Sequence, residues 1–125
     1  MNDITQLVGK VFRSVTNDGE RITFEGDESW TLYHDQDCCE SVGVEDVCGD
    51  LSDLEGTPIV TAEESGDRKE TDDGDAQWTF YTLRTIKGTV TIRFYGTSNG
   101  YYSTAVTLSR VVVMAVAHRA PRWWP

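Results

Sequence analysis

The second half of the chain alternates large apolar side chains with polar ones at the two-residue period of a β-strand. This alternation defines three segments, residues 78–86, 90–95 and 101–108. In the first segment it places Trp78 and Phe80 on one face of the strand, and Tyr81 and Leu83 on the other. Lys87-Gly88 and a glycine-flanked run separate the segments as turns. We therefore predict a meander of three antiparallel strands.

A second meander is predicted in the first third of the chain. Strand-like patterns cover residues 9–16, 21–25 and 30–33. The turn sequences Asn17-Asp18-Gly19 and Gly26-Asp27-Glu28 separate them. Such closely spaced strands pair with their sequence neighbours in an antiparallel ladder.

The region between the meanders is less regular. Val42, Val44 and Val47 predict a short strand or a sheet edge. Residues 49–56 predict one helical turn, with Asp50 as the N-cap. Pro58 to Ala62 then reads as extended chain, whereas residues 63–75 are highly charged and have no large apolar side chain. We expect residues 63–75 to form an exposed loop.

These elements predict a mainly β protein, β-rich within the α+β class, in which antiparallel meanders form a β-sandwich or a strongly bent sheet with one or two short helical turns. With 125 residues, the chain has the length of one domain. We place that domain at residues 1–110, followed by a C-terminal strand and a tail rich in Trp and Arg at 111–125.

Charge is distributed unevenly along the chain. Residues 1–75 contain all 21 acidic residues and 5 basic ones, for a net charge of −16, whereas residues 76–125 contain no acid and have a net charge of +6. An acidic protein repels phosphate backbones, so direct nucleic-acid binding is not expected. The longest apolar run, residues 111–117, is too short to span a membrane, and the N-terminus lacks a secretory signal pattern. These features predict a cytoplasmic protein with no membrane association.

The richest polar segment begins at His34. The candidate partner-binding residues there are His34, Asp35, Asp37, Cys38, Cys39 and Glu40. The cysteine spacing does not match a structural zinc site, and Glu40 occupies the position where a calcium-binding EF-hand loop needs glycine. We therefore predict no metal and no cofactor. The alternative interpretation is structural, with His34 hydrogen-bonded at a strand end and the cysteines reduced and buried.

A second candidate lies in the basic half. Arginine, aromatic faces and a polar turn could together hold a small anionic nucleotide-like ligand, and the residues concerned are Arg84, Arg93, Asn99, Tyr101 and Tyr102. The alternative is an ordinary sheet core with tyrosine hydroxyls at its rim.

The tail contains Trp123 and Trp124, which are adjacent. Two neighbouring tryptophans are expected to be covered, so we predict that they pack on the parent domain or form a homo-oligomer contact.

Several blocks of sequence resemble an uncharacterised family of small phage and prophage proteins. They are Tyr33–Glu40 (YHDQDCCE), Val44–Leu51 (VEDVCGDL), Gly56–Ile59, Ala62–Glu64, Trp78–Tyr81 and Ser98–Ser103 (SNGYYS), within roughly residues 5–108. The resemblance implies a phage-encoded protein in a bacterial cytosol and supplies no activity.

Three functional hypotheses follow. The first is a non-enzymatic phage accessory protein whose acidic face binds a host protein, such as a defence factor, and inhibits or redirects it. The alternative is a binding protein that sequesters the small anionic ligand described above. The third is a metal-binding protein or an enzyme that uses His34, Asp37 and Cys38.

Overall fold

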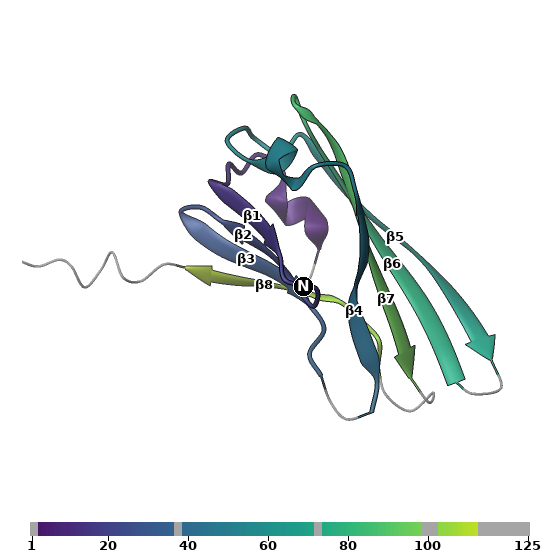
Figure 1. The fold of residues 1–125 in the computed structure, drawn as a ribbon. Helices are drawn as coiled ribbons and strands as arrows, with labels where there is room; N and C mark the ends of the chain where they lie inside the picture. Colours follow the sequence, from purple (N-terminus) through teal and green to yellow (C-terminus); the bar gives the residue numbers. More distant parts are fainter. Residues whose placement is uncertain (1–2, 37–38, 72–73, 99–102, 113–125) are drawn as a thin grey trace, which may run out of the picture.

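Two antiparallel sheets of four strands face each other (Figure 1). The computed structural model describes residues 3–36, 39–71, 74–98 and 103–112. The first sheet has the order β1-β2-β3-β8, with strands at Ser14–Asn17, Ile22–Glu25, Glu28–Tyr33 and Thr107–Val112. The second has the order β4-β7-β6-β5, with strands at Ser41–Cys48, Gly88–Ser98, Gly74–Thr85 and Thr61–Thr71. The predicted β-rich fold is thereby confirmed.

The predicted N-terminal meander is present as β1, β2 and β3, which pair in sequence order. Its first strand is shorter than expected, because regular pairing begins at Ser14 rather than near Gly9. The segment before it follows another part of the chain: Phe12 forms a bridge with Glu55, and the Gly9 N–H donates to the Ile59 carbonyl. Backbone groups of residues 9–12 are thus satisfied outside the first hairpin.

The prediction of an exposed loop at residues 63–75 is wrong. Strand β5 pairs with β6 along all 11 of its residues, from the pair Thr61–Arg84 to the pair Thr71–Gly74. The side chains of Glu63 to Glu70 are nevertheless exposed. An edge strand is stabilised by backbone hydrogen bonds to its single neighbouring strand. Charged side chains on such a strand discourage pairing with another molecule. The missing apolar residues therefore indicated an edge strand rather than a loop.

The third strand of the predicted second meander, residues 101–108, is also misplaced, because residues 103–106 are not in a strand and β8 begins only at Thr107. Strand β8 pairs with β3 in the first sheet instead of with β7. The reason is that the second edge of β7 is taken by β4, an edge strand of eight residues that contains the valines expected to form a short strand or a sheet edge. The chain therefore changes sheets twice, once between β3 and β4 and once between β7 and β8 (Figure 1).

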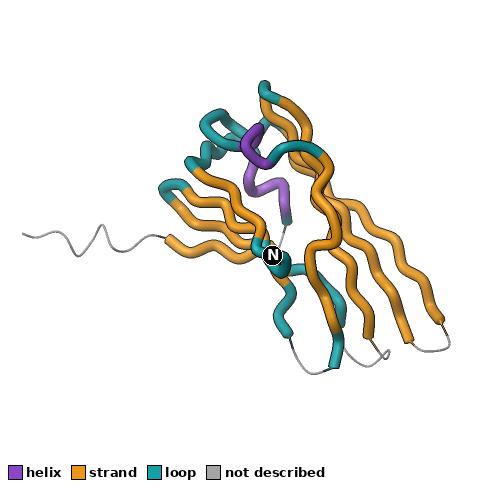
Figure 2. Tube along the Cα trace, in the orientation of Figure 1, coloured by secondary structure: helices purple, strands orange, loops and turns teal. Residues whose placement is uncertain are grey.

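Two single-turn 3₁₀ helices lie between the two sets of strands (Figure 2). The second, η2 (Leu51–Leu54), confirms the predicted turn, because the Asp50 carboxylate accepts the Ser52 N–H. Gly49 precedes it with a φ of 111°, and a Cβ there would lie 2.8 Å from the Thr89 carbonyl oxygen. The first, η1 (Ile4–Leu7), was not predicted and buries Ile4 and Leu7 in the core.

One apolar core joins both sheets and both helical turns. Tyr81 and Leu83 point into it from β6 and meet Phe94 and Ile92 of β7. The Tyr81 and Phe94 rings meet edge to face with centroids 6.0 Å apart. Trp78 and Phe80 lie on the opposite, half-buried face, as the alternation predicted. Within the described residues no helix is long and apolar enough to cross a bilayer.

Candidate functional site

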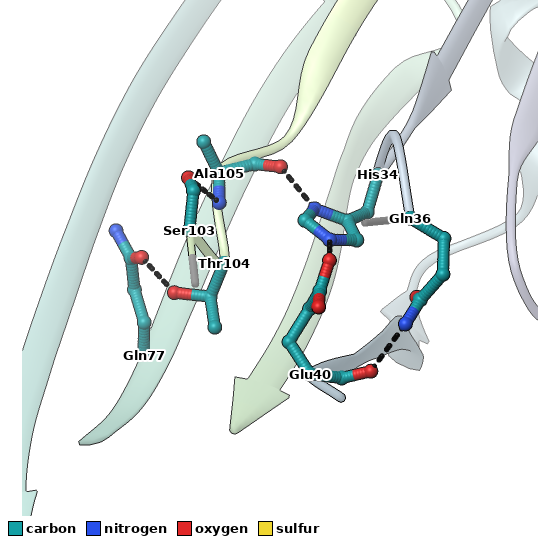
Figure 3. A network of polar contacts seen from close by, with 7 residues as sticks. All are labelled: His34, Gln36, Glu40, Gln77, Ser103, Thr104 and Ala105. Atoms are coloured by element: carbon teal, nitrogen blue, oxygen red, sulfur yellow. Dashed lines mark hydrogen bonds and ion pairs between the residues drawn. The ribbon is translucent and has the colours of Figure 1, made fainter. Parts of the chain in front are cut away.

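The polar segment after β3 closes around a buried pair, His34 and Glu40 (Figure 3). Nε2 of His34 lies 2.6 Å from Oε2 of Glu40, and Nδ1 lies 2.7 Å from the carbonyl oxygen of Ala105. The two side chains are only 5% and 0% exposed. A carbonyl oxygen can only accept, so Nδ1 carries a proton, and the contact with Glu40 requires a second proton between the ring and the carboxylate. The pair is a buried, proton-sharing unit.

This unit lies where the chain changes sheets. His34 follows β3, Glu40 precedes β4, and Ala105 precedes β8, so the contacts fasten both crossing connections to each other. The Gln36 amide donates to the Glu40 carbonyl, and Thr104 donates to the Gln77 side chain on β6 (Figure 3). Because both ring nitrogens of His34 are engaged, neither is available to take a proton from a substrate. We call the contacts of His34 with Glu40 and Ala105 the latch, because they hold the two crossing connections together.

An open pocket of about 420 Å³ lies beside the latch. Its lining residues are Glu20, Arg21, Tyr33, His34, Asp35, Gln36 and Val42. Asp35, a predicted site residue, is exposed there. The lining mixes two carboxylates with one guanidinium, so it presents no field of a single sign to a charged ligand. Asp37 and Cys38 lie outside the described residues.

The expectation of buried cysteines is wrong for Cys39 and Cys48, and the expectation of a reduced thiol is wrong for Cys39 but agrees with Cys48. Cys39 is exposed and disulfide-bonded. Cys48 is a free thiol and is exposed at the end of the edge strand β4. An edge strand has one open side, so a small residue at its end is not enclosed by neighbours.

Arg84 and Arg93 do lie on one face of the second sheet, but they do not form a common site. Arg93 is paired across the sheet with Phe80, four residues along β6 from Arg84, which corresponds to roughly 13 Å. Moreover, Nε of Arg93 lies 2.8 Å from Oε1 of Glu45, and Asp46 lies 3.5 Å away. Two carboxylates therefore already neutralise the guanidinium that was expected to bind an anion.

A β-bulge explains how two acids reach one arginine. The register of β4 against β7 shifts between Val44 and Asp46, so Glu45 is an additional residue opposite β7. A bulge sets two residues of one strand against one residue of its partner. The local irregularity thus directs both carboxylates to Arg93.

The remaining predicted site residues are not described by the structure. They are Asn99, Tyr101 and Tyr102, together with the tail residues Trp123 and Trp124. Among the residues that are described, no three His, Cys, Asp or Glu side chains come together in a way that could hold a metal ion.

The structure reveals a different candidate, which we call the outward face: the side of the second sheet that points away from the core. Trp78 of β6 and Tyr95 of β7 are directly paired, with ring centroids 5.1 Å apart and planes inclined by 45°. Phe80 continues the aromatic row beside Arg93. All three aromatic side chains are half-buried. Within the described chain, both helical turns and the first sheet lie on the other side of this sheet (Figure 1).

Acidic residues border the aromatic row on both edge strands. On β5, Asp67 is the cross-strand partner of Trp78, and Glu63 is the partner of Thr82. On β4, Glu45 and Asp46 flank Arg93. A shallow pocket of about 130 Å³ also opens on this face, lined by Asp46, Cys48, Phe80, Thr91 and Arg93. The outward face therefore has an aromatic centre with acidic residues on both edge strands, and strand alternation places Lys69 of β5 and Arg84 of β6 on the same face.

The alternation of β6 predicted that Trp78 and Phe80 share a face, but it was interpreted as ordinary core packing. A face that also included Arg93, Thr82 and Thr91 was a signal that it was not the core, because these side chains are polar. The acidic residues beside the aromatic row on β5 were not predictable, since residues 63–75 were assigned to a loop.

The tryptophan of the first sheet gives a useful contrast. Trp30 is 3% exposed, and Lys10 and Arg110 lie over its ring at 5.5 and 5.8 Å from the centroid. Glu28 accepts a hydrogen bond from the indole N–H and pairs with both cations. Hydrogen bonds from Lys10 and Trp30 hold the pKa of Glu28 below its usual value, and the charges of Lys10 and Arg110 add to this.

On the side of β5 that faces the core, a glutamate has its pKa shifted in the opposite direction. Glu64 is the cross-strand partner of Tyr81 and lies on the side that faces η1. Although the residue as a whole is exposed, partial desolvation of its carboxyl group raises the pKa of Glu64, and the negative charge of Asp3 adds to the shift. Burial also raises the pKa of the Tyr81 phenol, with a further contribution from Glu64.

Comparison with known proteins places the chain in a family. The family described as Domain of unknown function (DUF7448) matches residues 5–108. Comparison with curated proteins and with solved structures gave no match. The family has no assigned activity, in agreement with the predicted membership of an uncharacterised family. Because the match covers most of its length, the chain belongs to the DUF7448 family.

Proposed function

We propose that this protein is a non-enzymatic binding protein that docks a basic surface of another protein on its outward face. The observation that carries the proposal is the half-buried row of Trp78, Tyr95 and Phe80 with acids on both sides. Tyr, Trp and Arg are enriched at the centres of protein interfaces, and a charged rim steers a partner of opposite sign. A net charge of −10 acts in the same direction.

The biological setting that we propose is a phage accessory protein in the bacterial cytosol. There it would bind a host protein, for example a defence factor, and inhibit or redirect it. The resemblance to phage and prophage proteins and the small size support this setting. A homo-oligomer in which the tail residues Trp123 and Trp124 form the contact belongs to the same proposal.

The outward face favours a cationic partner over the anionic ligand of the alternative hypothesis. The guanidinium of Arg93 is already paired with Glu45 and Asp46, and a phosphate would have to displace them. The latch residues His34 and Glu40 are likewise engaged with each other and shielded from water. Neither arrangement supports an enzyme.

The test is affinity capture from a bacterial lysate with three forms of the immobilised protein. These are the native chain, the double variant Trp78→Thr/Tyr95→Thr, and the control Ile86→Thr. Ile86 is 82% exposed in the β6–β7 turn, so the control removes an exposed apolar residue away from the aromatic row. We expect a basic protein that is retained by the native chain and by the control but lost by the double variant.

Cys48 provides a native probe for the same face. It is a free, exposed thiol that lines the pocket next to Phe80 and Arg93. Its alkylation rate, followed by mass spectrometry of the peptide, should fall when the captured partner is bound. A partner that binds the double variant equally well and leaves Cys48 reactive would show that the outward face is not the docking surface.

A further inference from the structure

Three groups come together at the buried Trp30: an indole, a carboxylate and a cation. Glu28 accepts the indole N–H, and Lys10 and Arg110 lie over the ring. The outward face contains the first two of these groups at Trp78, because Asp67 is the direct cross-strand neighbour of that indole on β5. The cation–π contacts within the described chain are both at Trp30.

Resting on the proposed function, we infer that the third group, the cation, comes from the partner, as a lysine or arginine side chain over the Trp78–Tyr95 pair with Asp67 as its counter-ion. The faces of aromatic rings carry negative electrostatic potential, so two inclined rings 5.1 Å apart present a surface that attracts a cation. A nearby carboxylate adds direct attraction that is stronger at a partly desolvated interface than in water.

Neither arginine of the face fills this position. Arg84 is six residues along β6 from Trp78, which corresponds to roughly 20 Å. Arg93 is on the next row of the sheet, opposite Phe80, and its guanidinium is held by Glu45 and Asp46 at the β4 edge. The Asp67 carboxylate is exposed, and one of its oxygens accepts the Arg68 backbone N–H. Its second oxygen can accept from an incoming ammonium or guanidinium group.

The experiment uses the full-length protein labelled with ¹⁵N and three N-acetylated hexapeptide amides, of arginine, of lysine and of glutamine. Each tryptophan gives one indole N–H signal, and the Trp78 signal is assigned by its loss in Trp78→Leu. We expect the arginine and lysine peptides to shift the Trp78 signal more than that of buried Trp30, and the glutamine peptide to shift neither. A larger effect with arginine would identify guanidinium as the preferred group.

A matched charge control separates specific recognition from the general attraction of a polycation to an acidic protein. Asp67→Asn and Asp27→Asn each remove one exposed carboxylate, but Asp27 lies in the β2–β3 turn of the other sheet. Asp67→Asn and Trp78→Leu should each weaken binding about 2- to 30-fold, whereas Asp27→Asn should leave it nearly unchanged. Because Asp67 is exposed, its variant keeps the test valid even if Trp78→Leu unfolds.

The outcomes distinguish this inference from the proposed function. Equal weakening by Asp67→Asn and Asp27→Asn, or no shift of the Trp78 signal with either cationic peptide, overturns the cation site. If a lysate partner still requires Trp78 and Tyr95 in that case, the outward face is confirmed as a docking surface with a different mode of recognition. If partner capture does not depend on Trp78, the proposed function fails as well.

Discussion

Strands β6 and β7 present two faces that are built from the same two stretches of sequence and differ in what covers them. The inward face contributes Tyr81, Leu83, Ile92 and Phe94 to the core, and the outward face presents Trp78, Phe80 and Tyr95 half-buried. Large aromatic residues are needed inward to fill the core, whereas outward residues of a stable sheet can be polar. Aromatic residues at such positions therefore motivate the proposal that this face binds a partner.

The largest effect is expected from a neighbouring pair of residues that point in opposite directions. Phe94 is 1% exposed, so Phe94→Ala should lower the free energy of unfolding by about 4 kcal/mol. Tyr95→Ala, on the outward face, should lower it by only about 1 kcal/mol, because it loses the contact with Trp78 and little core volume. Urea unfolding measures both values. Equal losses would mean that the outward face is part of a buried interior.

The next effect compares a buried acid with an exposed one. Glu40→Ala leaves His34 without its partner in a desolvated site and should cost about 3 kcal/mol. Glu45→Ala removes a partner of Arg93 at the surface and should cost less than about 1 kcal/mol. A double-mutant cycle uses His34→Leu, Glu40→Leu and the double variant. The double variant should lose less free energy of unfolding than the two single leucine variants lose in sum. A fully additive cycle would contradict the latch.

The free energy of unfolding, measured as a function of pH, tests the site around Trp30 in the first sheet, where Glu28 pairs with Lys10 and Arg110. The pKa of Glu28 is lowered in the folded state, so its contribution is complete above the ordinary glutamate pKa and is lost as the pH falls through the folded value. Glu28→Gln should therefore be less stable than the native protein at neutral pH and should approach it in acid. An unchanged difference between pH 7 and acid pH would argue against an ionised Glu28 at this site.

The smallest effect, with the opposite sign, is expected at Glu64. Its pKa is raised by partial desolvation, so stability is lost as the pH rises from the ordinary glutamate pKa through the folded value. Glu64→Gln should thus be slightly more stable than the native protein at pH 7, by about 0.5 kcal/mol or less, and should lose this advantage in acid. A stability gain that grows in acid would be inconsistent with the assigned shift.

The local patterns of the chain predicted much of the secondary structure. Alternation in 78–86 and 90–95 correctly assigned β6, β7 and their two faces, and Asp50 correctly marked the start of η2. These signals are local, because side-chain period and capping act within a few residues. The edge strand β5 was missed because its stability comes from pairing with β6, which leaves no apolar signature.

The candidate site was predicted only in part. The sequence brought His34 and Glu40 to attention as a polar cluster, but their role as a latch depends on Ala105, which is distant in the chain. Likewise, Arg93 could be identified as a charged residue on a sheet, but its acidic partners come from a bulge in β4. Contacts between distant segments are decided by sheet order, which local patterns do not report.

The amino-acid sequence by itself determined a β-rich chain, the faces of its central strands, and the confinement of all acidic residues to residues 1–75. The tertiary structure decided that the chain crosses between the sheets before β4 and again before β8, and these crossings bury the His34–Glu40 pair. It also decided that β4 and β5, which carry acidic residues, are the edge strands beside the aromatic row. The reason is physical: strand period is encoded residue by residue, whereas strand partners are chosen by the core and the backbone bonds of the whole molecule.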